Sequence, residues 1–197
     1  MPLAIGVLQI LCLDIGTDLA PALALGAEPP TEGTLERPLV GRHLIDGALL
    51  RRVFAVLGPV EAAMAMAAFF AAYLAAGWRP GQPFDGGDAL LAASGATFAA
   101  IVVGQMANAF ACRSATRWVG RMRVGSNPLL LWAVLAELAA LAVFLFVPPV
   151  ADLLDQAPPP GWAWAVVVAT APLLLTADAV AKWLGHRRRR APVQAVR

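Results

Sequence analysis

The chain has 197 residues, of which 59% are hydrophobic and only 14% are charged, with a formal net charge of +2. Soluble domains usually carry about 25% charged residues, so this composition argues against a soluble enzyme and predicts an integral membrane protein. The two cysteines, Cys12 and Cys112, are too few for a disulfide framework and are expected to be reduced packing residues.

Five apolar stretches emerge from a sliding window of about 19 residues, and each can cross about 30 Å of hydrocarbon as a helix. We therefore predict an all-α, polytopic membrane protein with five transmembrane helices in one domain, residues 1–185, followed by a basic cytoplasmic tail, residues 186–197. The stretches run approximately Leu3–Leu25, Val53–Gly77, Ala89–Ala111, Pro128–Val147 and Trp162–Leu184.

The first stretch carries two carboxylates near its centre, Asp14 and Asp18. On a helix they share one face, one turn apart. A charged side chain at the middle of a bilayer costs about 2.5–3.5 kcal/mol on insertion scales. Two neighbouring acids are tolerable when they are protonated or when a cation lies between them. Cation binding or transport is therefore the first hypothesis.

Backbone signals in the same stretch support that hypothesis. Pro21 removes the amide that would bond to the carbonyl of Thr17, so the helix is expected to kink or unwind around Gly16 and Thr17. Freed backbone carbonyls and the Thr17 hydroxyl are oxygen ligands, which hard cations prefer. The alternative is a kinked packing helix with protonated acids.

Two later stretches contain further candidates. Gln105 and Asn108 lie three residues apart on the third stretch and nearly share a face. Gln105 is equally consistent with a ligand and with a hydrogen bond between helices, whereas Asn108 favours the latter. Glu137 lies close to the middle of the fourth stretch, so a proton, a partner or an ion must accompany it.

Two more acids lie inside the membrane segments. Asp178 can pair with Lys182 one turn later, which favours a plain ion pair. Glu61 lies about a third of the way along the second stretch.

Basic residues predict the orientation. Fourteen of the fifteen lysines and arginines fall on one side of the five stretches, and Arg79 falls on the other. The positive-inside rule makes the basic side cytoplasmic, with the N-terminus outside and the C-terminus inside. A first span that starts at residue 3 from the outside is easier to understand if the sequence once followed other spans or is the C-terminal piece of a longer protein.

No motif for soluble catalysis occurs. The sequence has no phosphate-binding Gly-rich loop, no HExxH and no nucleophile with a histidine base, so we expect no catalytic residue and no cofactor in this chain. The basic run after Gly185 is expected to contact anionic membrane lipid rather than nucleic acid.

Five segments of the sequence form a recognisable pattern. They are Asp14-Ile15-Gly16-Thr17-Asp18, Pro21-Ala22-Leu23-Ala24-Leu25-Gly26, Glu28-Pro29-Pro30, Glu36-Arg37-Pro38 and Gln105-Met106-Ala107-Asn108-Ala109-Phe110. With these segments, residues 8–38 resemble the P-type cation-transporting ATPases (the E1–E2 pumps). In that family the pattern belongs to the sixth of ten transmembrane helices and the loop after it, and the segment around Gln105 looks like the eighth helix. Five spans with an external start then match the sixth to tenth helices.

The resemblance implies a ligand set. Asp14, Thr17 and Asp18 correspond to cation ligands of the sixth helix. Asp14 falls where calcium pumps have asparagine. Gln105 falls where calcium pumps have glutamate and sodium/potassium pumps have glutamine. Glu137 looks like the ninth-helix glutamate of the sodium/potassium pumps. These differences favour a site for monovalent ions.

The family's phosphorylation motif, nucleotide domain, and fourth and fifth helices do not occur in this chain. The resemblance therefore implies the C-terminal membrane part of a pump in the plasma membrane, which contributes ion ligands but is not catalytic alone. An N-terminal pump half would be its partner and would hold ATP and Mg²⁺, and Na⁺, K⁺, Ca²⁺ and H⁺ all remain candidate cargo. The alternative is a stand-alone, non-enzymatic membrane protein or a degenerate pump remnant. An independent carrier is disfavoured because no inverted repeat occurs.

Overall fold

The computed structural model describes residues 1–28, 47–114 and 117–190, and every regular element in these ranges is a helix. Five helical segments are long and apolar enough to cross a membrane: Val7–Gly26, Leu49–Ala75, Asp88–Cys112, Pro128–Phe146 and Ala163–Gly185. They coincide with the five predicted stretches to within a few residues, so the predicted all-helical architecture is confirmed. The predictions for Pro29-Pro30, Glu36-Arg37-Pro38 and the last seven residues lie outside the described residues.

The first span is a helix interrupted in its middle. It consists of α1 (Val7–Leu11), the π-helix η1 (Cys12–Thr17) and α2 (Leu19–Gly26). The Asp18 amide donates to the Leu13 carbonyl oxygen at 3.1 Å, five residues back, which widens this turn. The predicted disturbance around residues 16 and 17 is therefore present, but the chain stays helical and does not unwind.

The second span has the same kind of interruption near its start. It consists of α3 (Gly47–Arg52), the π-helix η2 (Val53–Leu57) and α4 (Gly58–Ala75). Pro59, in the first turn of α4, lacks the amide that would bond four residues back within η2. A widened turn before a proline therefore occurs in both of the first two spans.

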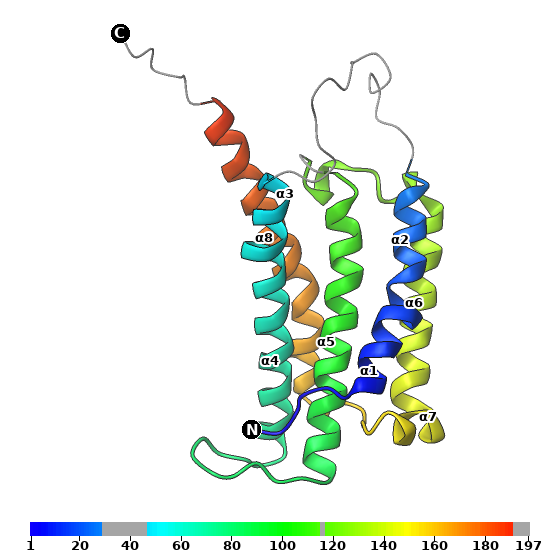
Figure 1. Cartoon of the computed structure of the whole chain (residues 1–197), viewed down its shortest axis with the longest axis vertical. Coiled ribbons are helices and arrows are strands. Elements are labelled where there is room, and N and C mark those ends of the chain that lie inside the picture. Colours follow the sequence, from blue (N-terminus) through cyan, green and yellow to red (C-terminus); the bar gives the residue numbers. More distant parts are fainter. Residues whose placement is uncertain (29–46, 115–116, 191–197) are drawn as a thin grey trace.

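Helix α5 (Asp88–Cys112) is the centre of the bundle. It packs against α4 and α8 on one side and against α2 and α6 on the other (Figure 1). Within its membrane window 61% of the residues are buried, against 22–28% in the other four spans. Many of its buried residues are alanine or glycine, which let neighbouring helices approach closely. Gly87 takes the N-cap position of this helix with φ +70°, and Asp88 is its first residue.

The remaining helices are α6 (Pro128–Phe146), the short α7 (Pro148–Leu153) and α8 (Ala163–Arg190). Two short 3-10 turns, η3 (Val119–Arg121) and η4 (Val124–Ser126), lie between α5 and α6. The predicted start of the fourth span is confirmed, because the Asn127 side chain accepts a hydrogen bond from the Leu130 amide at 3.1 Å. The loop between α4 and α5 lies at the same end of the bundle as α7, and the loop between α5 and α6 lies at the opposite end (Figure 1).

Candidate cation site on the first span

Asp14 and Asp18 lie at the interruption of the first span. Asp14 belongs to η1, and Asp18 is the residue between η1 and α2. Both side chains are exposed on the surface of the described bundle, and Asp14 acts electrostatically on Asp18. In the part of the chain that the structure describes, no three His, Cys, Asp or Glu side chains gather so that they could hold a metal ion. The pair therefore presents two acids on a face that the described helices leave exposed.

Thr17, between the two acids, points into the bundle. Its side chain is buried, and its hydroxyl oxygen lies 2.7 Å from the carbonyl oxygen of Leu13 and 3.1 Å from Oε1 of Gln105. Two of the predicted site residues are thus in direct contact across the first span and α5. Asn108 instead accepts a bond from the Cys112 thiol within its own helix at 3.5 Å.

Glu137 is the most isolated of the predicted site residues. It is 2% exposed, and neither of its carboxyl oxygens has a hydrogen-bond partner among the described residues. One turn earlier, Ala133 packs with Ala24 of α2, and one turn later, Leu141 belongs to the same buried cluster as Leu13. Glu137 therefore faces the first span between these two levels, where the helix is interrupted.

Asp18 connects the predicted residues electrostatically. Its charge acts on Glu137 of α6 and also on Glu61 of α4. Glu61 and Glu137 thus each lie within electrostatic range of Asp18, which follows Thr17 and its contact with Gln105.

Asp178 has a different environment. Its carboxylate accepts a hydrogen bond from Nε of Arg52 at 2.7 Å and lies 2.6 Å from Nζ of Lys182. Both cations also donate to the Ala111 carbonyl oxygen, at 3.0 and 2.9 Å, and Lys182 donates to the Arg117 carbonyl at 3.0 Å. The predicted pair with Lys182 is confirmed, and Arg52 adds a second cation that sequence reasoning missed. This network caps α5 and belongs to the fold.

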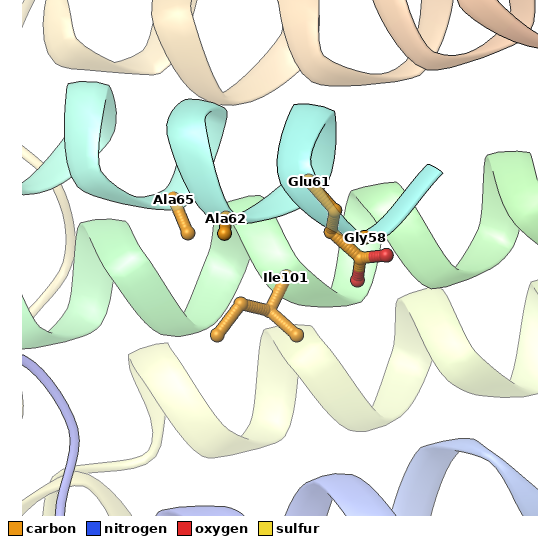
Figure 2. Close-up of a pocket in the computed structure, with 5 residues that line it drawn as sticks. All are labelled: Gly58, Glu61, Ala62, Ala65 and Ile101. Carbon is orange, nitrogen blue, oxygen red and sulfur yellow. The ribbon is translucent and has the colours of Figure 1, made fainter. Parts of the chain in front are cut away.

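Glu61 was predicted as a membrane-embedded acid without a role. It lines a groove of about 290 Å³ together with Gly58, Ala62, Ala65 and Ile101. Figure 2 shows its side chain extending from α4 toward α5, with the carboxylate beside Gly58. The sequence signal that could have drawn attention to it is a carboxylate within a run of small residues on an apolar span.

A buried polar network holds the N-terminal end of the first span. Nε2 of Gln9 lies 2.8 Å both from the Ser94 hydroxyl and from Oε1 of Gln156. Gln156 in turn donates to the Phe144 carbonyl at 3.1 Å. That carbonyl needs a donor because Pro148, four residues later, has no amide proton. Gln9 was not identified from the sequence.

A second network holds the C-terminal end of the first span. Arg113 donates to both carboxylate oxygens of Glu28, at 2.7–3.1 Å, and Asn127 donates to Glu28 at 2.7 Å and to the Ala24 carbonyl at 2.8 Å. The hydrogen bond from Arg113 holds the pKa of Glu28 below its ordinary value, although partial burial acts in the opposite direction. The interrupted helix is thus fixed at both ends, and its acids lie between the two anchors.

Comparison with known proteins agrees with this arrangement. Residues 2–184 match the family model described as "Cation transporting ATPase, C-terminus". The sodium/potassium-transporting ATPase subunit alpha of Drosophila melanogaster is 29% identical over 87 residues, which cover 43% of this chain and 8% of that protein. Calcium-transporting ATPase type 2C member 2 of Mus musculus is 29% identical over 151 residues, which cover 76% of this chain and 15% of that protein. The chain therefore spans only 8–15% of the length of these relatives.

Proposed function

Because this chain belongs to the family of C-terminal domains of cation-transporting ATPases, we propose that it supplies ion ligands to a P-type pump. The chain is a multi-pass membrane protein and the C-terminal transmembrane domain of that pump family. In the proposal, Asp14, Thr17, Asp18, Gln105 and Glu137 provide the oxygen atoms that this chain contributes to the path of the transported cation.

One observation carries the proposal: Asp14 and Asp18 lie exposed at a π-helical interruption, in the middle of a span that both ends hold in place. Exposed carboxylates within the hydrocarbon are costly, so a protein or ion partner must cover this face. A widened turn also frees backbone carbonyls. The carbonyl oxygen of Thr17 is one of them, because Pro21, four residues later, has no amide proton to donate. Carboxylates, a hydroxyl and carbonyls form an oxygen-rich set suited to hard cations.

The site needs a second half. We infer that helices of an N-terminal pump half pack on the open face of the first span and complete the ligand set. That half also holds ATP and Mg²⁺, since no phosphate-binding motif occurs in this sequence. The distribution of basic residues supports an external N-terminus and a cytoplasmic C-terminus, and the proposed location is the plasma membrane.

The cargo is a cation, with Na⁺, K⁺, Ca²⁺ and H⁺ as the candidates. Relatives named for sodium/potassium and for calcium transport match this chain at nearly equal identity. Gln105 and Glu137, by their resemblance to the sodium/potassium pumps, favour a monovalent ion. Titration with NaCl, KCl and CaCl₂ separates these possibilities.

The test is reconstitution. The chain is expressed together with an N-terminal pump fragment, from the upstream reading frame or from a related pump, and ATP hydrolysis is measured as each salt is added. Cation-dependent hydrolysis is expected, and Asp18→Asn is expected to abolish it, while Asp152→Asn on the exposed surface of α7 leaves it unchanged. Equal activity of the wild type and Asp18→Asn would overturn the proposal. No activity with any such fragment would favour the stand-alone membrane protein.

A further inference from the structure

Glu61 is placed differently from the other membrane-embedded acids. It lies in the first turn of α4 and lines the groove between α4 and α5 (Figure 2). In the described part of the chain it has neither a hydrogen bond nor an ion pair, whereas Asp178 has two cations. A carboxylate at this depth needs compensation, and the described bundle does not provide it.

Two contacts connect Glu61 to the candidate cation site. A methyl group at Gly104 of α5 would lie 3.1 Å from Cγ and 3.3 Å from Oε1 of Glu61, so the carboxylate rests against the backbone at that glycine. The next residue, Gln105, contacts the Thr17 hydroxyl at 3.1 Å, and Thr17 precedes Asp18. Glu61 of α4 thus packs against α5 at the residue that precedes Gln105.

Glu137 gives an independent indication of a ligand. It is 2% exposed and unpartnered among the described residues, and it faces the interruption of the first span from α6. A fully buried acid with no hydrogen bond is unusual, because burying an unpaired polar group is costly. Asp18 is therefore flanked by two uncompensated carboxyl groups, Glu137 from α6 and Glu61 from α4.

We propose that Glu61 is an additional cation-binding residue, so that α4 joins the first span, α5 and α6 in holding the transported ion. The inference rests on the proposed function and extends it to a helix outside the predicted ligand set. The groove of about 290 Å³ gives the carboxylate room to move toward the ion. Gly104 is the positioning residue, because a Cβ there would lie 3.1 Å from Cγ of Glu61 and the side chain would have to shift to make room.

Activation of the reconstituted pump tests the proposal. ATP hydrolysis is titrated with NaCl, KCl and CaCl₂ for Glu61→Gln, which removes the charge, and for Gly104→Ala, which keeps the charge but displaces it. Each variant is expected to raise the half-activating concentration of the activating cation by about tenfold while the maximal rate stays within about twofold. The double variant is expected to be no weaker than Glu61→Gln alone, since both changes act through one carboxylate. Glu61→Asp is expected to recover part of the affinity.

The controls separate this inference from the proposed function. Asp152→Asn is expected to leave the half-activating concentration unchanged. If Asp18→Asn abolishes activity while Glu61→Gln and Gly104→Ala both retain wild-type affinity, the role of Glu61 is overturned and the proposed function stands. If Asp18→Asn has no effect, both fail. If Glu61→Gln does not accumulate in the membrane, Gly104→Ala alone decides the question, and wild-type affinity in that variant overturns the inference.

Discussion

Glu137 and Asp178 are two buried carboxylates in opposite situations. They are 2% and 1% exposed, so both are buried inside the helical bundle. Asp178 lies between Arg52 and Lys182, whose charges and hydrogen bonds compensate it. Glu137 has no hydrogen-bond partner in the described ranges and lies within electrostatic range of another acid, Asp18. Burial alone therefore does not identify a functional acid, whereas burial without a partner points to a ligand outside this chain.

The largest effect is expected at Asp178. Asp178→Asn removes the carboxylate that pairs with both Arg52 and Lys182 and leaves buried positive charge uncompensated, which costs about 3–5 kcal/mol. Unfolding of the purified chain in SDS, followed by tryptophan fluorescence, measures this loss. A loss below about 1 kcal/mol would show that the two cations are already compensated by the carbonyls at the end of α5.

A smaller loss is expected at Lys182. Lys182→Met keeps the apolar stem and leaves Asp178 paired with Arg52, so the expected cost is about 1–3 kcal/mol. The loss comes from two hydrogen bonds that Lys182 donates to the Ala111 and Arg117 carbonyl oxygens and that methionine cannot make. Combining Lys182→Met with Asp178→Asn tests the coupling, and the two losses are expected not to add.

Glu137→Gln is the matched change at the unpartnered acid. It also replaces a buried carboxyl by its amide, but no partner is lost, so stability is expected to stay within about 1 kcal/mol of the wild type. In the reconstituted pump the same variant is expected to weaken cation activation. A stability loss as large as that of Asp178→Asn would mean that Glu137 is a structural acid, and the contrast between the two residues would disappear.

Much of the fold could be predicted from the sequence because membrane spans are defined by local properties. Length and apolar composition located the five spans. The cap at Asn127 and the pair of Asp178 with Lys182 follow from spacings of three and four residues. Pro21 located the interruption, but the form of the interruption was not predictable. A proline removes one hydrogen bond, and whether the helix then unwinds or widens depends on other contacts, such as that of Thr17 with Leu13.

Contacts between distant parts of the chain were not accessible to the same reasoning. Arg52 and Asp178 are 126 residues apart, and Gln9 and Gln156 are 147 residues apart. Such pairs depend on which faces of the helices meet, and alanine-rich spans carry little periodic signal to indicate those faces. The groove at Glu61 is of this kind, since it depends on a glycine of a neighbouring helix.

The smallest effect is expected at Glu28, which carries its charge just after the C-terminal end of the first span. Its pKa is held below the ordinary value of 4.5 by the hydrogen bond from Arg113, so the folded state favours the ionised form. The resulting stability is present above the unfolded pKa and is lost as the pH falls through the folded pKa. Because the carboxylate is partly exposed, Glu28→Gln is expected to cost only about 0.5 kcal/mol near neutral pH. Unfolding in SDS at a series of pH values is expected to show this difference shrinking below pH 4.5. A stability difference that persists into strong acid would mean that Glu28 stabilises this end of the first span through its hydrogen bond with Asn127 rather than through its charge.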